Sequence, residues 1–410
     1  MLNGMYLSPQ ASGHEVFPSL RKLKNTVFTA FHLICSINGT IMTDNASQAN
    51  FPAGIIEGFF GTPWDMKTRM AFIENLKGFG LNFYIYAPKN DSCLRRIWFE
   101  DFTKEYLSEL KRLSDRVKSC GMKFGIGFSP LGATADPDKY LPVFMKQVQK
   151  LVTELQPEYF ALLFDDMKIS LEHEGALQNT FIKECYRIVR PHGIHLVTCS
   201  SFYTTDPILE KVFGRMPETY YQDLLRDIPR DVDFFWTGSK VISTDYTAGD
   251  LKLAAELLGR KPFIWDNYPV NDGKKASDHL YLRHFNNRQN IRNLASGIAV
   301  NPMKQTFLNL FPLASVSKAL ETDDDKDIVT SALQKLSVNQ SREFIDFIRS
   351  NSEMFASVPL PELTEEMKES LLTKLESFKA GADNRELIQI RELQDFLNRR
   401  YVFDPACLTG

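Results

Sequence analysis

The sequence has no arrangement of cysteine or histidine that would mark a metal site or a disulfide framework. Six cysteines are scattered through 410 residues without a CxxC pair, and the seven histidines show no HExxH or similar spacing. Glycine-rich phosphate loops of the GxGxxG and GxxxxGK(S/T) kinds are also missing. These absences argue against zinc chemistry, a disulfide-stabilised fold and nucleotide chemistry. We therefore expect a protein that works without a metal ion or cofactor.

Long apolar runs and blocks of positive charge are absent as well. No segment reaches the length of about 18 apolar residues that a transmembrane helix needs. The formal net charge is −3 and no Lys/Arg-rich block stands out, so neither nucleic acid nor an anionic membrane is an expected partner. With 43% hydrophobic and 24% charged residues, the chain has the composition of an ordinary globular protein.

The N-terminal part carries the one ambiguous targeting signal. Basic residues between positions 21 and 24 precede the apolar stretch 27–35, which loosely imitates a signal peptide. The stretch is short, contains His32 and has no clear small-x-small cleavage site. We interpret residues 1–51 as a poorly ordered N-terminal extension. A cytoplasmic protein is the leading expectation, and export is the alternative.

From residue 52 onward, short apolar runs alternate with amphipathic segments that have a helical period of 3.6 residues. Alternating strands and helices indicate parallel strands joined by right-handed crossovers. The number of units and the length of this region match a (β/α)8 TIM barrel over residues 52–320, of class α/β. An open doubly wound sheet is the alternative. The eight runs with the length and composition of buried strands are 54–60, 82–86, 123–128, 159–165, 194–199, 233–236, 262–265 and 297–300.

After residue 320 the strand pattern stops. Pro359 and Pro361 mark one loop of this region, and residues 381–383 mark another. We expect residues 321–410 to form a C-terminal all-helical domain, a bundle packed on the barrel. Its predicted helices are 327–336, 341–354, 365–378 and 384–401.

Two adjacent carboxylates, Asp165 and Asp166, stand at the end of the fourth apolar run. Within a strand, neighbouring side chains point to opposite faces, so two adjacent acids would not reach the same substrate. At the C-terminal end of a strand the backbone leaves that geometry, and this is where α/β enzymes place their sites. The alternative is structural, because Asp often caps the helix that follows a strand. Two acids in a row favour a chemical role.

The other strand ends supply planar hydrogen-bonding groups and aromatic rings. Sugars are bound by such groups, and a glycosidic bond is broken by a carboxylic acid that protonates the leaving oxygen. The two acids, with these neighbours and without a metal or phosphate signature, therefore predict a carbohydrate site. Its polar candidates are Lys89 after the second run, Tyr203 after the fifth, Asn267 and Asp272 after the seventh, and Asn301 after the eighth.

Six motifs fall at strand ends in chain order: EGFFGTPW (57–64), YAPK (86–89), ALLFDD (161–166), WTG (236–238), WDN (265–267) and VNP (300–302). In this order they resemble glycoside hydrolase family 84, and the resemblance covers about residues 52–315. That family contains the O-GlcNAcases and bacterial β-N-acetylglucosaminidases. The resemblance therefore implies a barrel enzyme that hydrolyses β-linked GlcNAc.

The resemblance also implies a mechanism, substrate-assisted retention. The substrate's own 2-acetamido carbonyl attacks the anomeric carbon and forms an oxazoline. Asp165 would orient and polarise the acetamido N–H, and Asp166 would act first as general acid and then as general base. A raised pKa would suit Asp166, and the neighbouring carboxylate supplies one reason for it. Tyr203 joins these two as a catalytic residue, and the implied substrate-binding residues are Gly58, Lys89, Trp265, Asn267, Asp272 and Asn301.

Three departures from the family pattern concern the surroundings of the site. Phe60 stands where relatives often carry Tyr, Asn90 stands where an acid often follows the Lys, and residues 200–202 differ from the usual segment. None of these removes a proposed catalytic group. The leading hypothesis is removal of O-GlcNAc from Ser or Thr of glycoproteins or glycopeptides. The alternatives are hydrolysis of GlcNAc from glycans or glycosaminoglycans, and a non-catalytic GlcNAc-binding barrel.

Overall fold

The structure is a computed structural model that describes residues 51–409 except 169–171 and 339. Residues 1–50, which we interpreted as part of an N-terminal extension, lie outside the described residues. Residues from Pro52 onward form one compact unit. The expected division of this unit near residue 320 stays a prediction.

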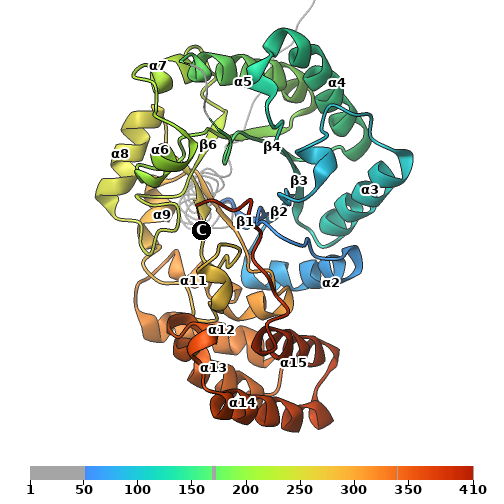
Figure 1. Cartoon of the computed structure of the whole chain (residues 1–410), viewed down its shortest axis with the longest axis vertical. Coiled ribbons are helices and arrows are strands. Elements are labelled where there is room, and N and C mark those ends of the chain that lie inside the picture. The colour runs from blue at the N-terminus through green and yellow to red at the C-terminus, as the bar shows by residue number, and fades with distance from the viewer. Residues whose placement is uncertain (1–50, 169–171, 339, 410) are drawn as a thin grey trace, which may run out of the picture. The chain divides into compact units, whose positions relative to one another are not determined.

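Eight parallel strands form a closed barrel in chain order, with the first strand paired to the last (Figure 1). Closure excludes the open doubly wound sheet and confirms the predicted (β/α)8 barrel. The strands are buried almost throughout, as their unbroken apolar runs require. They are β1 (Ala53–Glu57), β2 (Phe83–Tyr86), β3 (Lys123–Phe128), β4 (Tyr159–Leu163), β5 (His195–Cys199), β6 (Asp233–Trp236), β7 (Phe263–Asp266) and β8 (Gly297–Val300).

Helices follow the strands and surround the barrel (Figure 1). Several begin at a side chain that accepts a backbone N–H, such as Asp65, Thr103 and Thr247, which satisfies donors that a helix start leaves unpaired. The barrel helices are α2 (Met66–Leu76), α3 (Lys104–Ser119), α4 (Pro137–Leu155), α5 (Glu174–Val189), α6 (Ile208–Phe213), α7 (Tyr220–Leu224), α8 (Ala248–Leu258) and α9 (Gln289–Leu294).

Beyond β8 all the regular structure of the described chain is helical, and the last helix ends at Leu397. Glu392 on α15 accepts hydrogen bonds from the backbone N–H groups of Phe307 and Leu308, and Gln389 donates to the Phe307 carbonyl. These bonds fasten α15 to the segment that follows β8. The helices are α10 (Leu310–Leu313), α11 (Val316–Ala319), α12 (Asp325–Ser337), α13 (Arg342–Ser357), α14 (Glu365–Phe378) and α15 (Asn384–Leu397).

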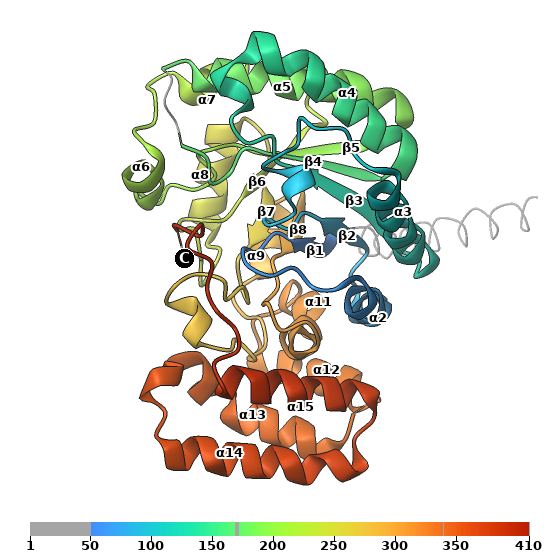
Figure 2. The same ribbon diagram turned by 45° about the vertical axis from the view of Figure 1, so that its right-hand side comes forward.

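The last predicted helix is shorter than expected. We expected it to reach residue 401, but α15 ends at Leu397 and Asn398 is its C-cap. Arg399 has φ +55°, a left-handed conformation that a helix does not continue through. The chain then runs without regular structure from α15 back to the barrel, as the dark red segment in Figures 1 and 2 shows.

Within the described residues, no helix is both long and apolar enough to cross a membrane.

Candidate active site

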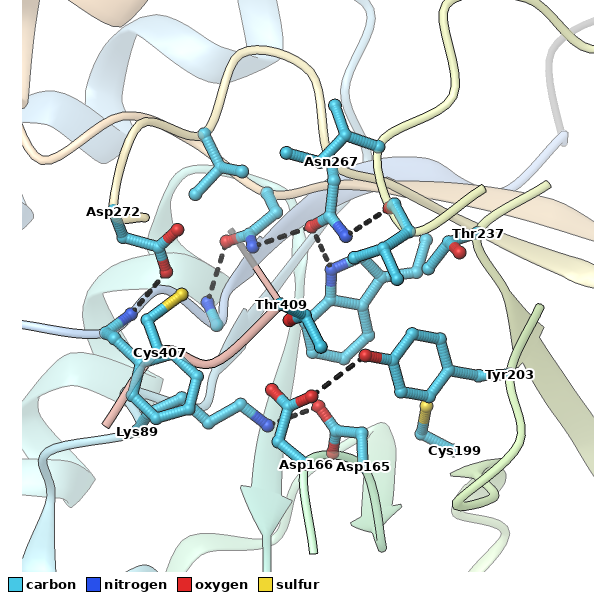
Figure 3. Close-up of a pocket in the computed structure, with 17 residues that line it drawn as sticks. Lys89, Asp165, Asp166, Cys199, Tyr203, Thr237, Asn267, Asp272, Cys407 and Thr409 are labelled. Carbon is cyan, nitrogen blue, oxygen red and sulfur yellow. Dashed lines mark hydrogen bonds and ion pairs between the residues drawn. The ribbon is translucent and has the colours of Figure 1, made fainter. Parts of the chain in front are cut away.

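The Asp165–Asp166 pair follows β4 after one further residue, Phe164. The Phe164 N–H still donates to the Cys199 carbonyl of β5 (2.8 Å), so strand pairing ends there. Asp166 has φ +57°, in the left-handed region that residues other than glycine rarely adopt. Because of this turn, the two consecutive side chains do not point to opposite faces as they would in a strand, and both carboxylates line one pocket (Figure 3).

Neither aspartate caps the helix that follows. Helix α5 begins at Glu174, nine residues beyond Asp165, and its N-cap is His173, which makes no capping bond through its side chain. The structural alternative for the pair is therefore excluded.

The pocket brings together all nine residues predicted to form the site (Figure 3). They come from the C-terminal ends of strands β1, β2, β4, β5, β7 and β8, or from the loops that follow them. The roles assigned to them stay predictions. The lining residues are Gly58, Phe60, Lys89, Asp165, Asp166, Cys199, Tyr203, Thr237, Val241, Ile242, Trp265, Asn267, Val270, Asp272, Asn301, Cys407 and Thr409.

Asp165 presents a charged acceptor atom that lacks a donor. The side chain is buried, and its Oδ2 accepts a charge-assisted hydrogen bond from Lys89 Nζ. Its Oδ1 is also buried, but no donor among the described residues reaches it. A buried acceptor without a partner is unfavourable until a ligand or a water molecule supplies a donor. The Asp165 carboxylate is thus held in place on one side and left open on the other.

Asp166 has the environment of a general acid. Burial raises the pKa of its carboxyl, and the charge of Asp165 raises it further, while Lys89 and Arg95 act in the opposite direction. A raised pKa keeps the proton on the carboxyl at a higher pH, as proton donation to a leaving group requires. Asp166 Oδ1 also accepts a hydrogen bond from the Tyr203 hydroxyl (2.8 Å). Burial and the Asp166 charge raise the pKa of Tyr203 well above 10, so that hydroxyl stays protonated.

Arg95 holds the backbone at Asp166. This buried side chain donates from Nη2 to the Asp166 carbonyl (3.2 Å) and from Nη1 to Ser129 Oγ (2.7 Å). It thereby bridges the loops after β3 and β4 at the residue with the left-handed backbone. Its charge also lowers the pKa of Asp166, against the effect of burial.

We expect Arg95→Gln to lower kcat by about tenfold or more, because a displacement of about 1 Å at a catalytic group can cost about 10²-fold. Loss of the guanidinium charge also raises the pKa of Asp166, so the basic limb of the pH profile of kcat/KM should move to higher pH. Kinetics across pH measure both effects. The control is Arg112→Gln on α3, whose exposed guanidinium lies 3.9 Å from Glu109. An unchanged basic limb would contradict the electrostatic role.

Two amide side chains, Asn267 after β7 and Asn301 after β8, form the floor of the pocket together with the backbone N–H of Gly58 after β1. Asn267 Oδ1 accepts from Trp265 Nε1 (2.9 Å) and from Asn301 Nδ2 (3.0 Å), while Asn267 Nδ2 donates to the Val241 carbonyl (2.8 Å). Asn301 Oδ1 accepts from the Gly58 N–H (3.2 Å). One N–H of Asn267 remains for a ligand. The floor therefore links the ends of β7, β8 and β1.

Gly58 packs directly against the indole of Trp265. A Cβ at this position would overlap the Trp265 ring. We expect Gly58→Ala to displace Trp265, raise KM and destabilise the fold by about 1–3 kcal/mol, the usual effect of overpacking. Gly78→Ala is the control, because a Cβ there meets no atom within 4 Å. Thermal melts and steady-state kinetics measure the two effects; equal behaviour of the two variants would refute the packing argument.

Asp272 faces the pocket from the loop after β7. Its Oδ2 accepts the Phe60 N–H (2.7 Å), which ties this loop to the one after β1. Burial raises the pKa of Asp272 to about 6, against the effect of that hydrogen bond. At neutral pH the carboxylate is thus mostly ionised and has acceptor capacity left for sugar hydroxyls.

Sequence reasoning missed Arg95, Cys407 and Thr409. Arg95 lies six residues beyond Lys89, and only its position after the second strand pointed to this edge of the barrel. Nothing in the sequence pattern connects Cys407 or Thr409 to a strand end. They reach the pocket because the chain beyond α15 returns to the barrel (Figures 1 and 3).

The described residues contain no group of three or more His, Cys, Asp or Glu side chains placed to bind a metal ion.

Sequence comparison gives one family and several relatives. The model of the family described as beta-N-acetylglucosaminidase matches residues 53–349. The Protein O-GlcNAcases of Rattus norvegicus and Mus musculus are each 26% identical to the chain over 292 residues. These matches cover 68% of this chain but 31% of each relative, so the chain spans about a third of their length.

Solved structures share the fold. A mutant O-GlcNAc hydrolase from Thermobaculum terrenum matches 87% of this chain and 79% of its own, with 24% identity and a TM-score of 0.66. CpGH84B matches 86% of this chain and 66% of its own, with 22% identity and a TM-score of 0.66.

The family match covers most of the chain, and its residues form a closed eight-stranded barrel that carries the six motifs at its strand ends. The chain belongs to the beta-N-acetylglucosaminidase family, glycoside hydrolase family 84.

Proposed function

We propose that this protein is a retaining exo-β-N-acetylglucosaminidase that removes O-GlcNAc from Ser or Thr of glycoproteins or glycopeptides by substrate assistance. The observation that carries the proposal is the open Oδ1 of Asp165, a buried carboxylate oxygen without a donor at the pocket. The N–H of a 2-acetamido group is the kind of donor that this atom lacks. By accepting it, Asp165 would orient the acetamido carbonyl toward the anomeric carbon and increase its nucleophilicity.

Asp166 supplies the proton chemistry in this mechanism. Its raised pKa suits donation of a proton to the glycosidic oxygen, while the hydrogen bond from Tyr203 orients the carboxyl and acts in the opposite direction on its pKa. After the oxazoline forms, the same carboxylate accepts a proton from the attacking water. Two adjacent acids on one strand end serve this chemistry because the nucleophile belongs to the substrate. An enzyme nucleophile would instead stand about 5 Å from the acid, against the other side of the reacting carbon.

The remaining pocket residues support recognition of the sugar. Trp265 lines the floor beside Gly58, and its ring lies 5.5 Å from Lys89 Nζ. Asn267 has one N–H left for the acetamido oxygen, and Asp272 has acceptor capacity for hydroxyl groups. The printed names of the mammalian relatives, Protein O-GlcNAcase, support a protein-linked sugar as the substrate.

Two comparisons test the proposal. The first is hydrolysis of aryl β-GlcNAc against aryl β-glucoside, which lacks the acetamido group. Substrate assistance predicts turnover of the first and none of the second; comparable rates on both would indicate an enzyme nucleophile such as Asp272. A thiazoline-type GlcNAc analogue should inhibit competitively. The second comparison is release of GlcNAc from an O-GlcNAc-modified protein against GlcNAc-terminated glycans, where faster release from glycans would assign the alternative substrate.

A further inference from the structure

The segment Val402–Thr409, here called the C-terminal strap, leaves the helical region and ends in the sugar pocket. Cys407 and Thr409 line that pocket together with the catalytic carboxylates (Figure 3). Figures 1 and 2 show the dark red chain passing from α15 to the mouth of the barrel. The strap therefore occupies the face at which substrates reach the strand ends.

The pocket is too small for a sugar while the strap is in place. The cavity measures about 40 Å³. A cavity of about 10–15 Å³, measured in the same way, already holds one water molecule, and pockets that hold small ligands usually measure about 300–1,000 Å³. A pyranose ring with an acetamido group is many times larger than one water molecule. Substrate and strap thus compete for the same space.

The strap is held by a few polar contacts to the barrel loops. Asn90 Nδ2 donates to Asp404 Oδ2 (2.8 Å), Lys304 Nζ donates to the Val402 carbonyl (2.9 Å), and the charge of Arg96 attracts Asp404 and lowers its pKa. Val402 and Leu408 are 72% and 52% exposed. A segment with exposed apolar side chains, no regular structure and few anchors is among the first parts of a protein to open.

We propose that the C-terminal strap is an autoinhibitory segment, which closes the sugar site in the resting protein and must swing away before a GlcNAc residue binds. The proposal rests on the proposed function of the pocket. An apparent dissociation constant rises as the open, binding-competent fraction falls. A weaker anchor should therefore lower KM, while kcat stays unchanged because the strap has already left in the substrate complex.

The Asn90–Asp404 contact allows a test by charge exchange, because neither side chain lines the pocket. Asn90→Asp places two carboxylates face to face and should lower KM for an aryl β-GlcNAc by about fivefold or more, the factor for loss of one hydrogen bond of average strength. The double variant Asn90→Asp with Asp404→Asn restores a donor and an acceptor in reversed order. Its KM should return to the wild-type value. Asp101→Asn, at an exposed ion pair with Lys146, is the control and should leave KM unchanged.

A second experiment detects displacement of the strap directly and does not depend on hydrolysis of a substrate. Iodoacetamide labelling of the full chain, read for each cysteine by mass spectrometry, is compared with and without a thiazoline-type GlcNAc analogue. The analogue should raise the labelling of Cys407 as the strap is displaced, and should leave the labelling of Cys120, which lies outside the pocket, unchanged. A ligand that bound beside a fixed strap would protect Cys407, so an increase in its labelling is specific to this proposal.

The outcomes separate this proposal from the proposed function. An unchanged or raised KM in Asn90→Asp, or unchanged or lower labelling of Cys407 with the analogue bound, would overturn the proposed role of the strap and leave the glycosidase activity intact. If Asn90→Asp neither hydrolyses aryl β-GlcNAc nor binds the analogue, the proposed function itself is overturned.

Discussion

Replacing Asp166 with Asn is expected to lower kcat/KM for β-GlcNAc on a poor leaving group by about 10²- to 10⁴-fold, the range for loss of general acid–base catalysis. Asn cannot donate a proton to the glycosidic oxygen. It nevertheless has the size of the carboxyl and can still accept the hydrogen bond from the Tyr203 hydroxyl. A substrate with an activated leaving group, such as a dinitrophenyl glycoside, needs little protonation and should lose much less. Rates on a series of aryl glycosides of different leaving-group pKa measure the difference.

The pattern across leaving groups decides the role of Asp166. Equal loss on poor and activated substrates would argue against a general acid and for a role in binding. Asp101→Asn serves as the control, since it removes a carboxylate that is exposed and lies outside the pocket. A thermal melt should show that Asp166→Asn remains folded.

Asp165→Asn is expected to lower kcat by about 10²- to 10³-fold on poor and activated substrates alike, as loss of one preorganised electrostatic contact does. The reason is that, in the proposed mechanism, Asp165 acts on the substrate's nucleophile and not on the leaving group. The affinity for a thiazoline-type analogue should fall as well. Steady-state rates on the same aryl series and inhibition constants provide the measurement, and a loss confined to poor leaving groups would exchange the roles of the two acids.

A destabilising effect accompanies this substitution and has its own control. Asp165→Asn leaves the Lys89 ammonium buried without its carboxylate, and a broken buried ion pair costs about 3–5 kcal/mol. The double variant with Lys89→Met removes both charges. It should recover much of the melting temperature but none of the activity. Recovery of activity with stability would mean that Asp165 acts only through the fold.

The barrel was predictable because each strand is buried on both faces and so reads as an unbroken apolar run. The Asp165–Asp166 pair and the polar residues at four other strand ends followed from the same geometry, since the C-terminal ends of parallel strands meet at one edge. The sequence predicted that the backbone leaves strand geometry at this pair, but not that the turn lies at Asp166. Only the φ of +57° shows how two consecutive side chains reach one pocket.

Other features depend on contacts that no local pattern records. The position of the Arg95 side chain depends on the hydrogen bonds that it donates to Ser129 and to the Asp166 carbonyl, which belong to two other loops. The end of α15 at Leu397 was predicted four residues too late, because apolar periodicity continues beyond the helix while the chain itself turns away at Arg399. Cys407 and Thr409 likewise reach the barrel through contacts between residues far apart in the sequence, which a local pattern does not record.

The amide floor of the pocket has a consequence for folding. Asn301 on the chain after β8 holds the Gly58 N–H across 243 residues of sequence, at the seam where the first and last strands pair. A chain that has formed only its first seven strands has Trp265 and Asn267, but neither the seam nor Asn301. Because contacts between distant parts of a chain form late, the floor is completed only when the barrel closes. The pocket can therefore bind the sugar only after the barrel has closed, and an incompletely folded chain does not retain its substrate.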